Sequence, residues 1–169
     1  MRVMIFGKQR AGKDTAADYL CEQYGFTKIR LADPVYDIAK KYFGMRKKDR
    51  GLLIAISEHL KQIDPDVWVK YALKRARRYD RVVISDVRFP NEYALLRQEG
   101  FKAIYIVASQ EARSKRDGYS PEYEDHPSEN YFQQFAADYV IVNELRLVDL
   151  YRQLDVVMRR WLSEEEAKA

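Results

Sequence analysis

The first strand and the glycine-bounded loop behind it limit what this chain can fold into more than any other feature. Residues 3–6 are apolar, and residues 7–15 read Gly-Lys-Gln-Arg-Ala-Gly-Lys-Asp-Thr. Gly7 and Gly12 let the backbone turn tightly and aim consecutive N–H groups at one point. A helix that starts near Lys13 adds the positive end of its dipole, and the lysine adds a cation. The pattern predicts a strand that runs into a loop binding a nucleoside triphosphate.

The spacing Gly-x-x-x-x-Gly-Lys is met, but residue 14 is Asp where Ser or Thr is usual, and the hydroxyl follows at Thr15. The alternative is a strand-to-helix turn without a ligand. The apolar strand before the loop and the amphipathic helix after it favour phosphate binding. We therefore expect the donor phosphates to contact residues of this loop: Gly7, Lys8, Ala11, Gly12, Lys13, Asp14 and Thr15.

Apolar runs alternate with helical patterns along the rest of the chain. The strands are expected at 2–6, 27–31, 81–85, 103–107 and 139–142. The helices are expected at about 13–24, 34–43, 51–61, 66–79, 91–99, 110–117, 129–136 and 146–162. Three of the strands, at 82–84, 104–107 and 139–142, are continuous apolar runs, which are typical of strands buried on both faces of a parallel sheet. The alternation predicts an α/β fold with helices on both faces of the sheet.

The composition is that of one soluble globular domain spanning residues 1–169. The net charge of +4 suits small phosphorylated ligands and does not require nucleic acid. The basic run at 74–78 lacks interleaved aromatic residues, so a solvated helix face is the better interpretation. The single cysteine, Cys21, excludes an internal disulfide and suits the cytoplasm. We expect no membrane segment or signal peptide. The sequence does not decide between a monomer and a homodimer.

A second charged cluster follows the apolar strand at 81–85. Asp86 ends this strand and Arg88 comes two residues later. Ligands of an open parallel sheet gather beyond the carboxyl ends of its strands, so Asp86 is expected beside the phosphate loop, where it could hold Mg²⁺. Arg88 could clamp a phosphate with two hydrogen bonds. The alternative is an Asp that caps the next turn and an Arg paired with it. Asn91 and Glu92 either cap the following helix or recognise a base or sugar.

Two longer segments exceed what a minimal sheet needs. Residues 34–79 insert about three helices after Asp33, which either caps the first of them or faces an acceptor substrate.

Residues 111–130 are polar and predict a mobile loop. Arg113 and Arg116 would share a helix face there and could neutralise a phosphoryl group, or form an exposed basic face. His126 is expected to fix this loop by a hydrogen bond, and two histidines with one cysteine make a zinc site improbable.

Several strings of this chain resemble the phage-type deoxynucleoside monophosphate kinases. They are Gly7–Thr15, Ala32-Asp33-Pro34, Pro65-Asp66-Val67-Trp68, Asp86-Val87-Arg88-Phe89-Pro90-Asn91-Glu92, Asp125-His126-Pro127-Ser128-Glu129 and Asn143 after the last strand. The general plan is also similar to adenylate, phosphomevalonate and dephospho-coenzyme A kinases. The resemblance implies a P-loop kinase three-layer sandwich with a five-stranded parallel sheet, an acceptor-binding insert at about 34–79 and an arginine-bearing lid at about 111–130. One departure is that His59 and Lys61 stand where an arginine near Glu58 is expected.

The resemblance implies transfer of the γ-phosphoryl of ATP to a (deoxy)nucleoside monophosphate. The acceptor phosphate is mostly dianionic near neutral pH, so alignment and charge neutralisation suffice. Other interpretations are a small-molecule phosphate kinase of the same fold and a nucleotide-gated binding protein. The expected catalytic residues are Lys13, Arg88, Arg113, Arg116 and Asp33. Mg²⁺ is expected at Thr15, Asp14 and Asp86. The acceptor is expected at Asp33, Trp68, Asp86, Arg88 and Glu92, with Trp68 stacking on a base or packing in the core.

Overall fold

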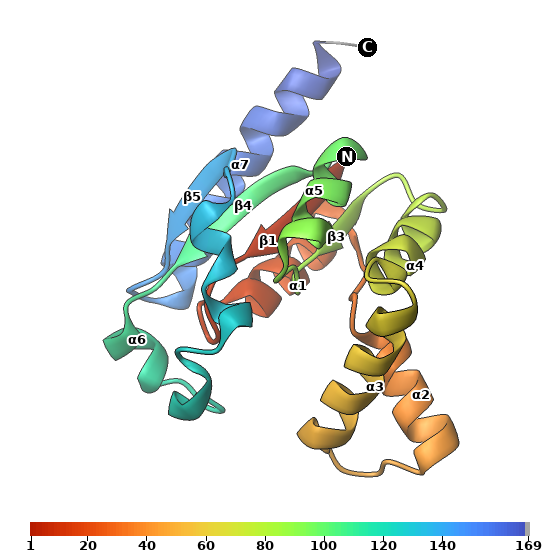
Figure 1. The fold of residues 1–169 in the computed structure, drawn as a ribbon. Coiled ribbons are helices and arrows are strands. Elements are labelled where there is room, and N and C mark those ends of the chain that lie inside the picture. The colour runs from red at the N-terminus through yellow and green to blue at the C-terminus, as the bar shows by residue number, and fades with distance from the viewer. Residues whose placement is uncertain (168–169) are drawn as a thin grey trace.

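The computed structural model describes residues 1–167 as helices packed on both faces of a parallel sheet (Figure 1). The strand order is β2-β3-β1-β4-β5, and every pair is parallel. The strands are β1 (Arg2–Phe6), β2 (Thr27–Lys28), β3 (Val82–Ile84), β4 (Lys102–Val107) and β5 (Tyr139–Val142). The helices are α1 (Lys13–Tyr24), α2 (Asp33–Phe43), α3 (Arg50–Ile63), α4 (Val67–Ala76), α5 (Pro90–Gln98), α6 (Gln110–Ser114) and α7 (Leu147–Glu166). The five-stranded α/β fold predicted from the sequence is confirmed.

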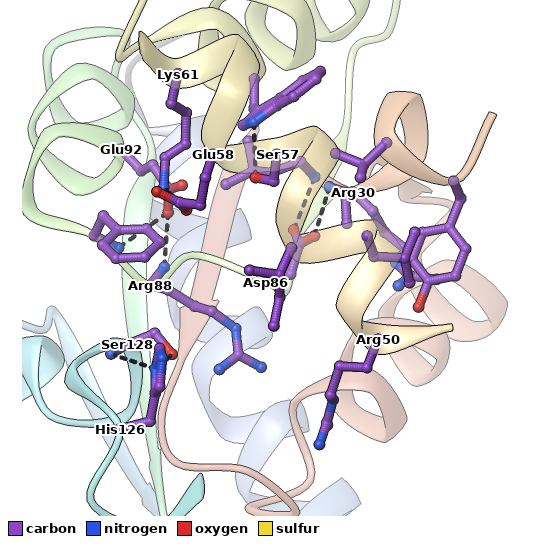
Figure 2. A pocket seen from close by; sticks show the side chains of 18 of the residues that line it. Arg30, Arg50, Ser57, Glu58, Lys61, Asp86, Arg88, Glu92, His126 and Ser128 are labelled. Carbon is purple, nitrogen blue, oxygen red and sulfur yellow. Dashed lines mark hydrogen bonds and ion pairs between the residues drawn. The ribbon is translucent and has the colours of Figure 1, made fainter. Parts of the chain in front are cut away.

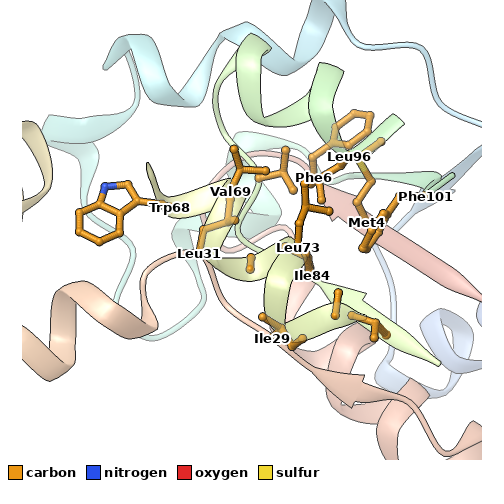
Figure 3. Close-up of a cluster of buried hydrophobic side chains, with 14 of the residues drawn as sticks. Met4, Phe6, Ile29, Leu31, Trp68, Val69, Leu73, Ile84, Leu96 and Phe101 are labelled. Carbon is orange, nitrogen blue, oxygen red and sulfur yellow. The ribbon is translucent and has the colours of Figure 1, made fainter. Parts of the chain in front are cut away.

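The central strand β1 divides the core because successive side chains of a strand point to opposite faces. Val3 and Ile5 pack with α1 and α7, whereas Met4 and Phe6 pack with α4 and α5. Figure 3 shows the hydrophobic cluster on the face of the sheet covered by α4 and α5, where Met4 and Phe6 lie near side chains of these helices. Both faces of β1 are therefore buried, and the loop that follows it is anchored to the middle of the sheet.

The helices expected at 34–79 do not form one unit. Apolar residues of α4, among them Val69 and Leu73, pack on the sheet, so this helix belongs to a covering layer. α2 and α3 pack on each other and extend away from the sheet on the side of its carboxyl ends (Figure 1). We call α2 and α3 the insert. The Asp49 side chain begins α3 by accepting a hydrogen bond from the Leu52 N–H at 2.9 Å.

The segment after β4 is more ordered than the sequence indicates. A helix is expected at 129–136, but α6 is followed by three short 3-10 turns at Pro121–Tyr123, Pro127–Glu129 and Tyr131–Gln134. Pro121 and Pro127 each stand at the first position of such a turn, where proline is tolerated because the N–H there has no partner within the helix. We call residues 110–134 the lid. It lies across the sheet's carboxyl end from the insert (Figure 1).

The strand β5 was expected to be buried on both faces, and this is wrong for one face. Val140 and Val142 are 51% and 54% exposed, while Ile141 between them is buried against α7. The reason is that Val140 and Val142 point to the face of the edge strand β5 that lies opposite α7, whereas Ile141 points toward α7. The sequence run shows hydrophobicity but not position within the sheet.

The longest helix, α7, buries one face and presents charged side chains on the other. Its buried side includes Leu150, Leu154 and Trp161, which pack with α1. This amphipathic pattern is typical of a helix on a globular core. Within residues 1–167, no helix combines the length and the apolar character that crossing a membrane requires.

Candidate active site

The loop between β1 and α1 has the geometry of an anion-binding loop. Gly7 and Gly12 adopt φ values of 146° and 107°, which other residues rarely adopt. A Cβ atom at Gly7 would overlap the Ile106 carbonyl oxygen, and one at Gly12 would overlap the side chain of Asn143. The Asn143 amide donates to the Ala11 carbonyl at 2.8 Å and so ties the loop to the end of β5. The two glycines are thus required by both conformation and packing.

Lys13 opens α1 and turns its ammonium back into the loop. Its Nζ donates to the carbonyl oxygens of Gly7 at 2.7 Å and Lys8 at 2.8 Å. Burial, together with the charge of Arg88, lowers the pKa of Lys13 from 10.5 to about 8, against the opposing charges of Glu129, Asp14 and Asp86. A phosphate anion beside the ammonium would favour its charged form. This is the position and chemistry expected of a residue that binds donor phosphates.

Asp14 does not point back into the loop but joins α1 to the end of β3. The Ser85 hydroxyl donates to its carboxylate at 2.9 Å, and Lys28 lies 2.9 Å away. Burial alone would raise the pKa of Asp14, but its bonds to Lys28 and Ser85 outweigh burial and lower it. The carboxylate therefore stays charged. Thr15 follows on the same helix turn and is half-buried.

These oxygen donors suit Mg²⁺, which is usually held by one or two carboxylates together with substrate phosphates. Asp14 supplies a charged carboxylate beside the loop, and the hydroxyls of Ser85 and Thr15 stand near the same helix turn. Within residues 1–167, no group of three or more His, Cys, Asp or Glu side chains is arranged to hold a metal ion by itself. The residues present fit a metal that is shared with a bound nucleotide.

Asp86 has a structural partner that the sequence does not show. Both of its carboxylate oxygens accept backbone N–H groups, from Leu31 and Ala32, each at 3.0 Å. Burial raises the pKa of Asp86, while these two bonds oppose the increase. The residue therefore joins the end of β3 to the chain that follows β2. It still lines the cavity described next, as expected for a strand end.

A cavity of about 570 Å³ opens between the insert, the strand ends and the lid (Figure 2). Its volume lies within the range of small-molecule sites. The insert contributes one wall, with Lys48, Arg50, Leu53, Ile54, Ser57, Glu58 and Lys61. The strand ends and α5 contribute Arg30, Asp86, Arg88, Phe89 and Glu92, and the lid contributes Tyr123, His126, Ser128 and Glu129. Gln9 of the phosphate loop also lines it, so the cavity adjoins the loop.

Three arginines from three separate segments line this cavity. In Figure 2, Arg88 extends into the space between the His126–Ser128 turn and Arg50. The guanidinium of Arg30 lies over the Tyr36 ring at 5.4 Å, and that of Arg50 lies over the Tyr123 ring at 3.9 Å. Guanidinium groups bind phosphate with two parallel hydrogen bonds. The cavity therefore holds guanidinium groups of the kind that bind a phosphorylated ligand, next to carboxylates such as Glu129, which pairs with Arg88.

Sequence reasoning identified Arg88 but missed Arg30 and Arg50. Arg30 could have been found, because it stands near the carboxyl end of β2, where ligands of parallel sheets gather. No sequence signal indicates Arg50, which reaches the cavity from the start of α3. The structure therefore places one arginine of the insert at the cavity, at the start of α3 and not near Glu58.

Trp68 and Glu92 both line the cavity, and both side chains also make hydrogen bonds that stabilise the fold. The Trp68 indole N–H donates to the Ser57 hydroxyl at 3.1 Å, and the ring is buried in the core cluster. Glu92 accepts the N–H groups of Arg88 at 2.9 Å and Phe89 at 3.0 Å, which caps the start of α5. Burial raises the pKa of Glu92 to about 7, although these two hydrogen bonds favour the charged form.

Asp33 stands outside this cavity. It begins α2, and its carboxylate accepts the Arg30 N–H at 3.3 Å and lies 3.4 Å from Arg75. It is absent from the side chains lining the cavity within residues 1–167. The structure thus places Asp33 in the first turn of α2, where no side chain caps the helix, so the capping alternative is not supported and the acceptor role stays a prediction.

The structure places the lid arginines at the phosphate loop, but both are engaged. Arg113 is only 2% exposed, and its guanidinium binds both oxygens of Glu124, at 2.5 and 2.8 Å. Arg116 donates to the carbonyl oxygens of Arg10 at 2.6 Å and Asn143 at 2.7 Å. Neither guanidinium faces the cavity, so a role in neutralising the phosphoryl group requires the lid to rearrange.

His126 fixes the turn that carries Ser128. Its Nδ1 accepts the Ser128 N–H at 3.2 Å and lies 2.7 Å from the Ser128 hydroxyl. This hydrogen-bonding role agrees with the sequence interpretation.

Comparison with known proteins gives the context for this site. Residues 2–66 match the family model of deoxynucleotide monophosphate kinase. The resemblance inferred from the sequence motifs is confirmed over this stretch, which includes the phosphate loop and the insert. A curated relative is the uncharacterized protein ORF76 of Ictalurid herpesvirus 1 (strain Auburn), 28% identical over 112 residues. The alignment covers 62% of this chain, and the chain spans about half of the relative, 46% of its length.

Solved structures show the same fold at low sequence identity. Dephospho-CoA kinase from Campylobacter jejuni has a TM-score of 0.61 at 16% identity, over 97% of this chain and 98% of that chain. Shikimate kinase from Acinetobacter baumannii has a TM-score of 0.59 at 14% identity, over 96% and 93%. Deoxyadenosine kinase from M. mycoides has a TM-score of 0.53 at 16% identity, over 96% and 100%. The chain has the P-loop kinase fold.

Proposed function

We propose that this protein transfers the γ-phosphoryl group of ATP to a (deoxy)nucleoside monophosphate, giving the diphosphate. The observation that carries the proposal is the cavity lined by Arg30, Arg50 and Arg88 beside a phosphate loop. A protein that only binds or hydrolyses a nucleotide needs one phosphate site. Here a second cationic site adjoins the first, as transfer between two phosphates requires.

The cavity also offers apolar surfaces to a nucleoside. Leu53 and Ile54 of the insert, with Phe89 at the start of α5, form apolar parts of its walls. The Phe89 ring has the Lys61 ammonium 4.1 Å from its centroid. A flat apolar base between such walls, with its phosphate toward the arginines, would satisfy both kinds of lining. The match of residues 2–66 to deoxynucleotide monophosphate kinase supports this acceptor class.

The side chains carry out the proposed reaction by alignment and charge neutralisation. The loop N–H groups and Lys13 would hold the donor phosphates, while Arg30, Arg50 and Arg88 would hold the acceptor phosphate. A phosphate acceptor is mostly dianionic near neutral pH, so no general base is needed. Asp14, with Ser85 and Thr15, would hold Mg²⁺, which supplies positive charge to the phosphate oxygens during transfer.

A panel of acceptors tests the proposal. The protein is incubated with Mg·ATP and each nucleoside monophosphate, with phosphomevalonate and dephospho-coenzyme A in parallel, and ADP formation is measured. We expect at least one nucleoside monophosphate to give ADP well above the rate without acceptor. The Lys13→Ala variant, compared with an exposed Lys115→Ala control, should lose this turnover. If no acceptor exceeds the rate without acceptor, the proposal is wrong.

A further inference from the structure

Glu129 of the lid reaches into the phosphate loop. One carboxylate oxygen accepts the Gln9 backbone N–H at 2.6 Å, and the other pairs with the guanidinium of Arg88. The Glu129 side chain is 4% exposed, so this contact is shielded from water. A surface ion pair would be weak, but a buried carboxylate with a backbone donor and a guanidinium is strongly held.

The two partners of Glu129 belong to the two halves of the proposed transfer site. Gln9 lies in the loop whose N–H groups are expected to bind donor phosphates. Arg88 lines the cavity that is expected to bind the acceptor. A carboxylate oxygen and a phosphoryl oxygen make the same kind of hydrogen bond to these donors. Glu129 therefore bridges the phosphate loop and the cavity through two donors that phosphoryl oxygens can also bind.

A second carboxylate holds the lid against the loop. Glu124 binds Lys8 at 2.7 Å and also binds both guanidinium nitrogens of Arg113. The Gln9 side chain adds a hydrogen bond to the Ser120 carbonyl at 2.7 Å. The lid thus neutralises the cation of Lys8, next to the N–H group that Glu129 occupies. These contacts describe a lid closed on the loop through acidic side chains.

We propose that Glu129 is a built-in phosphate mimic, which occupies the position of the transferring phosphoryl group and which the terminal phosphate of ATP must displace. This inference rests on the proposed function because it takes the loop as the donor site. Displacement frees Arg88 for the acceptor phosphate and couples donor binding to release of the lid. The closed lid lowers the apparent affinity for ATP by the fraction of molecules in which the loop is open.

The test compares binding of two nucleotides by isothermal titration calorimetry, without any acceptor. The ligands are ADP and a non-hydrolysable ATP analogue, each with Mg²⁺. The Glu129→Gln variant keeps the shape of the side chain but removes its charge. Glu122→Gln removes a charge from an exposed position of the same lid and is the matched control. Melting curves of each variant establish that it is folded.

We expect Glu129→Gln to bind the ATP analogue about tenfold more tightly than the unmodified protein, the size expected when one charge-assisted hydrogen bond no longer competes. ADP, which lacks the terminal phosphate, should gain much less, and Glu122→Gln should change neither affinity. An unchanged or weaker affinity of folded Glu129→Gln for the analogue would overturn the proposal. An equal gain for ADP would overturn it too, since Glu129 would then not mark the terminal phosphate.

Hydrogen exchange of the unmodified protein gives a second test that does not depend on the variant folding. The analogue should speed exchange of lid amides such as the Glu129 N–H, which donates to the His126 carbonyl at 2.8 Å. Equal or slower exchange in the lid would contradict displacement. If the unmodified protein binds neither nucleotide, the proposed function itself fails. If the protein binds nucleotide but shows neither the affinity gain of Glu129→Gln nor the faster exchange of the lid, only the phosphate-mimic proposal is wrong.

Discussion

The Ser85 hydroxyl donates a 2.9 Å hydrogen bond to the Asp14 carboxylate and so joins the end of β3 to the first turn of α1. In P-loop enzymes generally, a hydroxyl on the loop and an aspartate on a strand hold Mg²⁺. We propose that the two chemical groups have exchanged places here, with Asp14 on the loop and the Ser85 hydroxyl at the strand end. Both kinds of oxygen donor are then kept although the loop lacks Ser or Thr after Lys13. The unusual residue of the motif therefore has a partner that explains it.

The exchange predicts that Asp14 governs the metal requirement. Asp14→Asn should raise the Mg²⁺ concentration needed for half-maximal nucleotide binding by about tenfold or more, as for other metal-site substitutions. Asp18→Asn is the matched control because Asp18 also pairs with Lys28, at 3.0 Å. A Mg²⁺ titration of nucleotide binding measures both. Equal shifts in the two variants would show that the Lys28 ion pairs, and not a metal ligand, cause the effect.

Arg30 is predicted to bind the acceptor. Arg30→Ala should raise the KM for the acceptor about tenfold, the loss of one charge-assisted contact, and leave ADP affinity nearly unchanged. Arg75→Ala is the control, because Arg75 lies near the same Asp33 carboxylate but does not line the cavity. Steady-state kinetics and calorimetry separate the two effects. An acceptor KM that moves no more in Arg30→Ala than in Arg75→Ala would exclude this role.

The buried Glu92 predicts a pH dependence of stability. Its pKa is about 7 in the folded protein and 4.5 when unperturbed. Between these values the folded state binds more protons than the unfolded state, so stability falls as pH rises through this interval. The loss is up to about 3 kcal/mol. Urea unfolding at several pH values should show a flatter profile for Glu92→Gln, whereas Glu58→Gln, more exposed at the same cavity, should follow the unmodified protein. Parallel profiles for all three would contradict the assignment.

The ion pair between Arg113 and Glu124 is predicted to stabilise the lid. Glu124→Gln leaves the buried guanidinium without its charged partner and should cost about 2–3 kcal/mol of unfolding free energy. Arg113 lowers the pKa of Glu124 to about 2, so the contribution is complete above pH 4.5 and is lost as pH falls through about 2. Denaturant unfolding measures the change, with Glu122→Gln as the exposed control. A cost no larger than the control's would rule out this stabilisation.

The sequence was sufficient for the fold because its signals are local. Glycine spacing at Gly7 and Gly12 predicts the loop, and the alternation of apolar runs with helical patterns predicts the parallel sheet. The exposed face of β5 could not be predicted, since edge position depends on the order of strands in space. Similarly, the helix expected at 129–136 is divided between two short 3-10 turns, Pro127–Glu129 and Tyr131–Gln134, which the local pattern did not indicate.

The site was harder to predict because its residues are paired over long sequence distances. Asp86 binds the N–H groups of Leu31 and Ala32, which become neighbours only when β2 pairs with β3, and its role at Mg²⁺ stays a prediction. Glu124 binds Arg113, and the role of this arginine at a phosphoryl group also stays a prediction. Glu129 gave no charge signal of its own, although it lies within one of the strings that carried the resemblance.

The proposed function requires that the phosphate loop and the cavity form the two halves of one transfer site. A bisubstrate analogue, in which ATP is joined through its terminal phosphate to a nucleoside monophosphate, tests it directly by calorimetry. We expect one equivalent to bind about a hundredfold more tightly than ADP, because linkage makes the second binding event intramolecular. Both Lys13→Ala and Arg30→Ala should weaken it. An analogue that binds no more tightly than the non-hydrolysable ATP analogue would show that the loop and the cavity do not act as one transfer site.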